Sequence, residues 1–196
     1  MLIVGLTGSI AMGKSKTASI FKDLGYKVFD ADQAVHDLYA NDLDIIKDIS
    51  EICPIAIIDN KVNRQALSEC IAKDSTIIKN IEAVVHPRIQ ILRNEFIKVA
   101  EQQGSEFVLL DIPLLFETGR EDEVDKIIVV TTSPEIQRQR ALDRPNLSKE
   151  KFEWILSKQL SDSEKRKRAD FIVDTSVSVE DATLQVKKIV AILDPS

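Results

Sequence analysis

The sequence predicts an α/β fold, in which short buried strands alternate with helices, and its N-terminal part carries that prediction. Residues 2–6 form a short apolar run bounded by glycine, which is typical of a buried strand. Residues 8–15, GSIAMGKS, fit the pattern G-x-x-x-x-G-K-[ST], the phosphate-binding loop of nucleoside triphosphatases. Apolar residues at helical spacing follow as far as Gly25, which predicts the end of a helix. Strand, glycine loop and helix in this order are the context that the motif requires.

The residues of this loop predict a binding site for a nucleoside triphosphate. Gly8 and Gly13 can adopt positive φ angles, which allow the backbone to close around an anion. The loop N–H groups and the N-terminus of the next helix then point at phosphate oxygens. Lys14 would bring a positive charge to the β- and γ-phosphates, and Ser15 would offer a hydroxyl to Mg²⁺. The alternative interpretation is a glycine-rich turn with a surface lysine.

Composition places the chain among globular proteins. Its 196 residues are close to the size of one α/β domain with an insertion or a lid. The contents of 44% hydrophobic and 30% charged residues are ordinary for that class. A net charge of −6 argues against a sequence-independent nucleic-acid binder, although a small anionic ligand needs only local positive charge.

Cys53 and Cys70 lie among apolar residues without metal-ligand spacing, which favours reduced thiols in a core. The chain has only 2 histidines, so a His/Cys metal site is not expected. No segment combines the features of a secretion signal, and no apolar run approaches the roughly 20 residues that cross a bilayer. We therefore expect a cytoplasmic protein with no membrane partner.

A second strand is predicted over residues 26–29, and it leads into Asp30 and Asp32. Ligands of open α/β sheets bind outside the carboxyl ends of the strands, so both carboxylates are site candidates. Alternatively, one aspartate caps the following helix, which is expected to start near Gln33. One aspartate can cap that helix while the other takes part in chemistry.

Residues 33–103 are predicted to be helical, with no clear strand. Apolar residues recur near the helical period over 43–52, and Pro54 ends that helix. Residues 59–61 are typical of a turn, and Asn63 is a good N-cap for the next helix.

His86 and Pro87 mark the predicted start of a further helix, which follows an apolar segment over 75–85 and stops at Gly104. By itself, His86 fits a packed or solvated junction residue better than a ligand contact. A stretch of about seventy residues is too long for a plain crossover. We therefore interpret 33–103 as a helical substrate-binding insertion.

The third predicted strand covers residues 107–110 and ends at Asp111. An aspartate in this position of a phosphate-loop protein is suited to organise magnesium. The apolar residues 112–116 that follow need cover, either from the core or from an apolar part of a ligand. Burial in the core is the favoured interpretation.

A fourth strand over 126–130 precedes a helix that Ser133 caps. We expect this helix to carry Arg138, Arg140 and Arg144, the last two on one face. One interpretation is a solvated basic face paired with acids. In a phosphate-loop protein, however, arginines after the fourth strand favour a lid that closes over phosphate.

The C-terminal part is predicted to contain helices and a fifth strand. A helix over 148–159 is followed by Ser161, which opens a capping box. The basic run 165–168 fits a solvated helix end better than a nucleic-acid patch. A strand over 171–173 and a final helix capped by Ser178 complete the chain.

Several separated pieces of the sequence share their order and spacing with one family of kinases. They are the phosphate loop with residues 5–7 before it, Asp30-Ala31-Asp32, His86-Pro87-Arg88-Ile89, Asp111 to Glu117 (DIPLLFE), Gln137, Arg140, Arg144, Gln159 and Ala169-Asp170. On these residues the chain resembles the dephospho-coenzyme A kinase family. DIPLLFE with His-Pro upstream is far more specific than the phosphate loop.

The resemblance implies ATP-dependent phosphorylation of the ribose 3′-hydroxyl of dephospho-CoA, the last step of CoA synthesis. It implies a three-layer P-loop fold with a five-stranded parallel sheet, ATP and dephospho-CoA as small-molecule substrates, and Mg²⁺. We expect a monomer or a small homo-oligomer that binds no nucleic acid. The core would comprise residues 1–32, 104–132 and 170–196, with a CoA-binding insertion over 33–103 and a lid over 133–169.

The resemblance also assigns roles to individual residues. Asp32 looks like the catalytic base, assisted by Lys14 and Arg140, while Ser15 and Asp111 would hold magnesium. Contacts to the nucleotide would come from Gly8, Ala11, Met12, Gly13, Lys14, Ser15, Lys16 and Arg144. Contacts to the acceptor would come from Asp32, His86, Asp111, Leu114, Leu115, Phe116 and Glu117.

The chain departs from the family pattern in a few places. Ser9 and Ala11 stand at usual glycine positions of the phosphate loop, Met12 at a usually small one, and Lys16 replaces a Ser or Thr. Residues 175–177 replace an Asn and a Gly expected near the adenine. Other interpretations are a nucleoside monophosphate kinase, a non-catalytic nucleotide-binding module and a GTP-dependent switch. The Asn-Lys-x-Asp pattern of such switches is missing.

Overall fold

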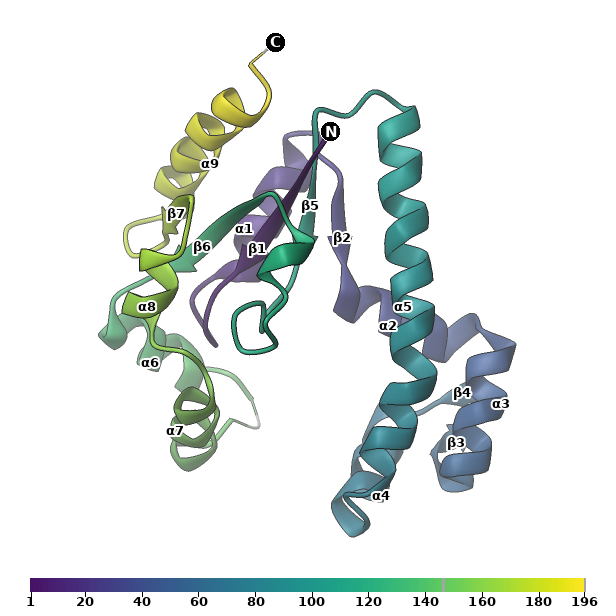
Figure 1. The fold of residues 1–196 in the computed structure, drawn as a ribbon. Helices are drawn as coiled ribbons and strands as arrows, with labels where there is room; N and C mark the ends of the chain where they lie inside the picture. Colours follow the sequence, from purple (N-terminus) through teal and green to yellow (C-terminus); the bar gives the residue numbers. More distant parts are fainter. Residues whose placement is uncertain (146, 196) are drawn as a thin grey trace. The chain divides into compact units, whose positions relative to one another are not determined.

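The computed structural model describes residues 1–145 and 147–195 (Figure 1). The chain divides into two compact units. The first, called the sheet unit, comprises Met1–Phe29 and Ala100–Ser196. The second, called the inserted unit, comprises Asp30–Val99. Among the described helices, none has both the length and the apolar character of a membrane-spanning segment.

Within the described residues, five strands form one sheet in the order β2-β5-β1-β6-β7 (Figure 1). On β1, Val4 lies between Leu109 of β5 and Lys126 of β6, and both pairings are parallel. The strands predicted from the sequence and the three-layer α/β fold are confirmed. The strand bounds are β1 Leu2–Thr7, β2 Val28–Asp30, β5 Phe107–Asp111, β6 Lys126–Thr131 and β7 Phe171–Asp174.

The main core lies between this sheet and two helices, α1 (Lys14–Asp23) and α9 (Val179–Leu193). Alternate strand residues such as Leu6 and Leu109 pack against Phe21 of α1 and Val186 of α9. All of β5 is buried, as expected for a central parallel strand covered on both faces. The predicted helix stop at Gly25 is also confirmed, with a φ of 90°.

The segment between β6 and β7 contains α6 (Pro134–Leu142), α7 (Lys149–Lys158) and α8 (Asp162–Lys167). The predicted N-caps are confirmed, because Ser133 and Ser161 each accept a backbone N–H of the following helix. A short 3₁₀ helix, Glu121–Glu123, precedes β6. The prediction that Arg144 shares a helix face with Arg140 is wrong, since α6 ends before Arg144.

The inserted unit has its own apolar core, built around residues such as Leu38, Ile49 and Leu67. The prediction that it lacks strands is wrong, because Ile57–Ile58 and Lys61–Val62 form a short hairpin. The predicted turn joins these strands, and Asp59 and Asn60 adopt φ angles of 51° and 58°, typical of a tight hairpin turn. The elements are α2 Ala31–Asn41, α3 Leu43–Ile52, the 3₁₀ helix Pro54–Ala56, β3 Ile57–Ile58, β4 Lys61–Val62, α4 Arg64–Lys73 and α5 Ile77–Gln102.

Helix α5 continues through Pro87, so the predicted helix start at His86 and Pro87 is wrong. A proline inside a helix removes one backbone donor and usually kinks or ends it. Here Val85 before the proline and Ile89 after it pack on the same core, which favours one continuous helix. The His86-Pro87 pair is therefore compatible both with a helix start and with the interior of a packed helix, and the local sequence did not distinguish the two.

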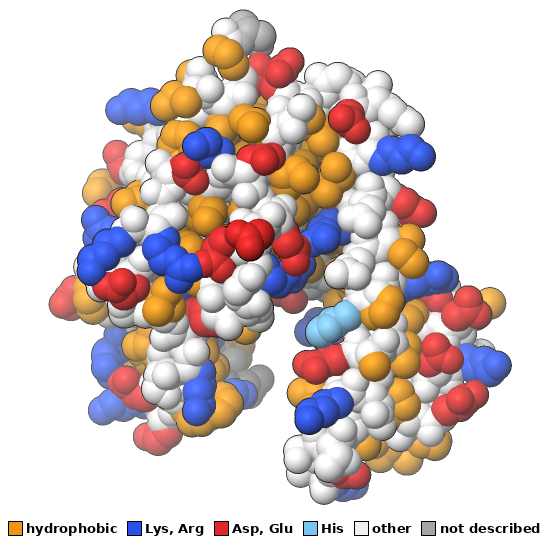
Figure 2. Space-filling model, viewed as in Figure 1, with side chains coloured by type: hydrophobic (Ala, Val, Ile, Leu, Met, Phe, Trp, Pro, Cys, Tyr) orange, Lys and Arg blue, Asp and Glu red, His pale blue; other side chains and the backbone are white. Residues whose placement is uncertain are grey.

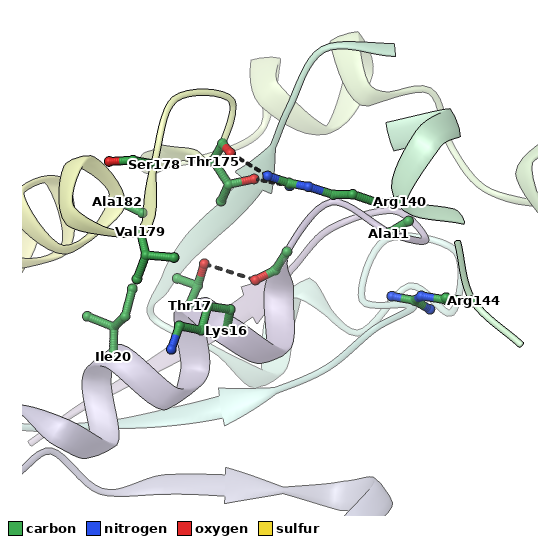
Figure 3. Close-up of a pocket in the computed structure, with 11 residues that line it drawn as sticks. Ala11, Lys16, Thr17, Ile20, Arg140, Arg144, Thr175, Ser178, Val179 and Ala182 are labelled. Atoms are coloured by element: carbon green, nitrogen blue, oxygen red, sulfur yellow. Dashed lines mark hydrogen bonds between the residues drawn. The ribbon is translucent and has the colours of Figure 1, made fainter. Parts of the chain in front are cut away.

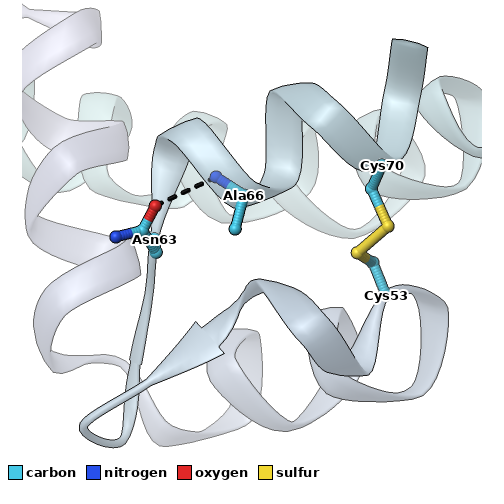
Figure 4. The surroundings of a disulfide bond; sticks show 4 residues. All are labelled: Cys53, Asn63, Ala66 and Cys70. Carbon is cyan, nitrogen blue, oxygen red and sulfur yellow. Dashed lines mark hydrogen bonds between the residues drawn. A yellow bond between two sulfur atoms is a disulfide. The ribbon is translucent and has the colours of Figure 1, made fainter. Parts of the chain in front are cut away.

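Cys53 and Cys70 form a disulfide, so the prediction of reduced thiols is wrong (Figure 4). Cys53 follows the end of α3 and Cys70 lies in α4, with a Cα–Cα distance of 6.6 Å. The intervening hairpin reverses the chain, and Asn63 caps α4 through the N–H of Ala66. Sequence spacing alone could not show that this reversal brings the two sulfurs together.

Candidate active site

The phosphate loop connects β1 to α1, and its glycines serve different purposes. Gly13 adopts a φ of 94°, as expected, and Ala11 also adopts a positive φ, of 63°. The expectation of a positive φ at Gly8 is wrong. A Cβ at Gly8 would instead lie 2.7 Å from the carbonyl oxygen of Val130, so close backbone approach requires glycine there.

The start of α1 is suited to bind an anion. Among the described residues, no side chain caps this helix at Gly13, so the first N–H groups of the helix can serve a ligand. Within the loop, the N–H of Met12 donates to the carbonyl of Ser9 at 3.2 Å. Ala11 and Gly13 have positive φ angles and Met12 between them does not. Such alternation is typical of backbone concavities that bind anions.

Lys14 and Asp111 are brought together by the sheet. Asp111 ends β5 next to Leu6 of β1, and its carboxylate forms an ion pair with the Lys14 ammonium. Both side chains are largely buried, with exposed fractions of 15% for Lys14 and 7% for Asp111. Ser15 follows at the exposed edge of the helix start. Hydroxyl and carboxylate oxygens of this kind are ligands that Mg²⁺ accepts together with phosphates and water.

A cavity of about 380 Å³ opens beside the loop (Figure 3). Ile20 of α1 and Val179 and Ala182 of α9 provide an apolar side. Its other lining residues include the backbone of the loop and cationic side chains. They are Ala11, Gly13, Lys16, Thr17, Arg140, Arg144, Thr175 and Ser178.

Arg140 is fixed beside this cavity by Thr175, which follows β7 (Figure 3). Its guanidinium donates to the Thr175 hydroxyl and to the Thr175 carbonyl, each at 2.8 Å. The Thr175 hydroxyl in turn donates to the carbonyl of Met12 at 2.9 Å. Loop, β7 and Arg140 are therefore held together by one buried threonine, whereas Arg144 lies exposed in the turn after α6.

The apolar segment after Asp111 is largely core, as predicted, because Leu115 and Phe116 are buried. Leu114 differs, with 42% of its surface exposed. Glu117 accepts the N–H of Leu160 at 2.9 Å and forms an ion pair with Lys165 at 2.8 Å.

Lys165 is fully buried, so the prediction of a solvated basic run is wrong for this residue. Burial alone would raise the pKa of Glu117, but Lys165 and backbone N–H donors together hold the pKa below its ordinary value. Arg168, at the end of the run, lies over the ring of Phe116 at 4.6 Å and pairs with Glu121. The run thus ties the end of α8 to the segment after β5.

In the inserted unit, Asp30 caps α2 by accepting the N–H of Gln33 at 3.0 Å. Asp32 lies in the first turn of that helix and is exposed. His86 is exposed on α5, directly after buried Val85. Asp30 therefore takes the capping role, which leaves the Asp32 carboxylate available for another one.

Comparison with known sequences decides the family. The sequence model described as Dephospho-CoA kinase matches residues 2–181. The chain belongs to the dephospho-CoA kinase family.

A dephospho-CoA kinase from Rhodopseudomonas palustris is 46% identical over 189 residues, which cover 96% of this chain and 94% of that protein. Among solved structures, a protein from Thermus thermophilus has a TM-score of 0.79 at 31% identity, covering 98% of this chain and 97% of its own. Dephospho-CoA kinase from Campylobacter jejuni has a TM-score of 0.70 at 27% identity, with 99% and 98% covered. The family resemblance of the sequence motifs is thereby confirmed.

In this member of the dephospho-CoA kinase family, the roles of Gln137, Gln159 and Thr175 were not predicted from the sequence. Gln137 donates to the Ile10 carbonyl and Gln159 accepts the Ile10 N–H. Both glutamines belong to the family pattern, which was the available signal, but the pattern did not show what they contact. Thr175 stood out only as a departure, and its bond to the phosphate loop required the fold.

Proposed function

We propose that this protein transfers the γ-phosphoryl group of ATP to the ribose 3′-hydroxyl of dephospho-CoA, giving CoA and ADP. One contact carries the proposal. Lys14 of the phosphate loop pairs with Asp111, the first residue of the family-specific DIPLLFE segment. The residues suited to ATP and those suited to the acceptor therefore meet at the carboxyl ends of β1 and β5, where such sheets bind ligands.

For the nucleotide, the triphosphate would lie on the N-terminus of α1, with Lys14 offsetting its charge. The nucleoside would occupy the cavity lined by Ile20, Val179 and Ala182, beside the fixed guanidinium of Arg140. Lys16 and Arg144 line the same cavity and would add positive charge near the phosphates. Gly8 and Met12 would act through the backbone shape of the loop.

Ser15 and Asp111 are the oxygen donors that would hold Mg²⁺. Bound there, the ion would offset the charge of the phosphates. Asp111 pairs with the Lys14 ammonium, so one carboxylate would serve both the ammonium and the ion.

For the acceptor, we assign Asp32 as the base that orients the ribose hydroxyl and accepts its proton. The inserted unit, with His86, would hold dephospho-CoA over residues 33–103, and residues 133–169 would form the lid. Of the acceptor candidates in DIPLLFE, Leu114 has apolar surface to offer. Leu115 and Phe116 would support it from the core, and Glu117 would hold the segment through Lys165.

An acceptor panel tests the proposal. Purified protein is given Mg·ATP with dephospho-CoA, AMP, CMP or GMP, and ADP release is followed with a coupled assay. We expect release above background with dephospho-CoA. Turnover with a nucleoside monophosphate but not with dephospho-CoA would assign a different kinase activity, and ATP binding without any transfer would indicate a non-catalytic module.

We further propose that the enzyme works in the cytoplasm as a monomer or small homo-oligomer, without nucleic-acid or membrane partners. On the face drawn in Figure 2, basic and acidic side chains are interspersed over the sheet unit, in keeping with a small-molecule enzyme. Alkylation of free thiols in fresh cell extract would report whether the disulfide between Cys53 and Cys70 is present in the cell. Sedimentation would report the oligomeric state.

A further inference from the structure

The tip of the phosphate loop is bound on both sides by glutamine side chains. The Nε2 amide of Gln137 on α6 donates to the Ile10 carbonyl at 2.8 Å. The Oε1 atom of Gln159, at the end of α7, accepts the Ile10 N–H at 2.9 Å. Gln137 is 5% exposed, so its bond to the loop is shielded from water.

The sense of these bonds is fixed by chemistry. An Ile10 carbonyl can only accept and an Ile10 N–H can only donate, so each glutamine has a single usable amide end. Gln137 must present its NH₂ group, and Gln159 must present its oxygen. The two residues are therefore not interchangeable, although they have the same side chain.

The bonds control the peptide planes on either side of Ile10. In a trans peptide the carbonyl and the N–H point in opposite directions. Holding the Ile10 carbonyl therefore directs the N–H of Ala11 away from Gln137, and holding the Ile10 N–H directs the carbonyl of Ser9 away from Gln159. That Ser9 carbonyl receives the Met12 N–H, which closes the turn of the loop.

Apolar packing adds to the same connection. The methyl group of Ala11 is buried with Ala141 of α6 and Phe152 of α7. Ala11 has a positive φ, a conformation that is unfavourable for a residue with a Cβ atom. Packing and hydrogen bonds from α6 and α7 thus help to hold the loop in this unfavourable conformation.

We propose that Gln137 and Gln159 form an amide clamp that positions the phosphate loop for the triphosphate of ATP. Neither glutamine touches the reacting atoms, so both are positioning residues. This inference rests on the proposed function for the identity of the nucleotide, and it adds the element that sets the shape of the loop. If the clamp acts in this way, the affinity for the triphosphate depends on hydrogen bonds made by α6 and by the end of α7.

The test uses the full chain and a non-hydrolysable ATP analogue with Mg²⁺, and it measures the dissociation constant by calorimetry. Gln137→Met and Gln159→Met remove each hydrogen bond at nearly constant side-chain volume. We expect each to raise the dissociation constant about tenfold, as loss of one net hydrogen bond would. Gln139→Met, on the exposed side of α6, is the control and should leave it unchanged.

The donor and acceptor senses give a sharper pair of variants. Gln159→Glu keeps an oxygen acceptor for the Ile10 N–H, whereas Gln137→Glu places a carboxylate against the Ile10 carbonyl. Both variants add the same charge beside Ile10, but only Gln137→Glu replaces the donor to the Ile10 carbonyl with an acceptor. We expect Gln137→Glu to bind the analogue about tenfold more weakly than Gln159→Glu.

Kinetics and folding separate positioning from general stability. The KM for ATP should rise in the Met variants, while the KM for dephospho-CoA should stay within about twofold. Calorimetry is carried out below the melting temperature of each variant, so that the measured dissociation constant is that of folded protein. Equal affinities of the two Glu variants, or Met variants that bind like wild type, would overturn the clamp. Absence of transfer to dephospho-CoA by wild type would count against the proposed function alone, because analogue binding needs no acceptor.

Discussion

The sheet unit and the inserted unit are held together by different interactions. In the sheet unit, polar ties fix the loops around the site: Lys14 with Asp111, Arg140 with Thr175, and Glu117 with Lys165. The inserted unit depends on a small apolar core and on the Cys53–Cys70 disulfide. Asp42 adds one tie there, since it caps α3 and accepts from Arg88 at 2.9 Å.

The same difference appears in the candidate site residues. Lys14, Asp111 and Arg140 of the sheet unit are bound to other protein groups, which would pre-organise the proposed nucleotide site. Those of the inserted unit, Asp32 and His86, are exposed on helix surfaces. The comparison indicates that substitutions in the sheet unit change stability and nucleotide affinity together, whereas exposed residues of the inserted unit can change catalysis alone.

The largest expected effect comes from Asp32→Asn, which tests the exposed side of the comparison. We expect turnover to fall roughly 10²- to 10⁴-fold, the usual contribution of a positioned base, with ATP binding unchanged. Single-turnover rates and analogue calorimetry measure the two quantities. Asp30→Asn is the matched control, because asparagine caps helices as well as aspartate. Near-normal turnover in Asp32→Asn would remove that residue from the role.

The next effect, on stability, is expected from Lys165→Met. Removing one partner of a buried ion pair leaves Glu117 uncompensated, which typically costs about 3–5 kcal/mol of unfolding free energy. Urea unfolding followed by circular dichroism measures it. Lys167→Met on the same helix, whose pair with Glu164 is exposed, should change stability by less than about 0.5 kcal/mol.

The same pair predicts a pH dependence. Since folding lowers the pKa of Glu117, its contribution to stability is present above the ordinary glutamate pKa of 4.5 and is lost as pH falls through the folded value. The stability difference between wild type and Lys165→Met should therefore shrink on acidification below that value. A difference that stays constant down to the acid transition would contradict the assignment.

Much of the sheet unit could be predicted because its signals are local. The phosphate-loop motif, the caps Ser133 and Ser178, and the buried runs of β5 and β6 each depend on a few adjacent residues. Sequence patterns of this kind report local backbone preference and burial. Bonds such as Thr175 to Met12 join residues far apart in the chain, so no local pattern contained them.

The inserted unit was predicted less well because its structure depends on tertiary contacts between short segments, such as the hairpin pairing and the disulfide. Asp59 and Asn60 gave a turn, but strands this short have too few residues to show alternation. Pro87 looked like a helix start because packing of Val85 and Ile89, which keeps the helix continuous, is a tertiary effect. Asp32 and His86 were found through the family resemblance, and their roles in this chain stay predictions.

A smaller effect is expected from breaking the disulfide, which tests whether the two units are independent. Reduction by dithiothreitol should lower the unfolding free energy by about 3 kcal/mol, as for other loops of this length. Affinity for the ATP analogue should stay within about twofold, because the disulfide lies in the inserted unit. Cys70→Ala is the control, since dithiothreitol should not affect it. A large loss of nucleotide affinity on reduction would contradict the independence of the units.

The smallest effect is expected from Ala11→Gly. Relief of the left-handed alanine offsets the loss of a buried methyl group and the added chain entropy, so stability should change by less than about 1 kcal/mol. Ala18→Gly, in the buried face of α1 with ordinary helical geometry, has no such relief. Thermal unfolding should show the larger loss at Ala18. The reverse order would contradict the account of the loop.

The proposed function requires that one molecule of ATP phosphorylates one molecule of dephospho-CoA on this protein. The most direct measurement is mass spectrometry of the reaction products over time, with ADP quantified in parallel. We predict that CoA carrying a 3′-phosphate forms in equal amounts with ADP. ADP formed without CoA, or dephospho-CoA left unchanged by active, nucleotide-binding protein, would contradict the claim.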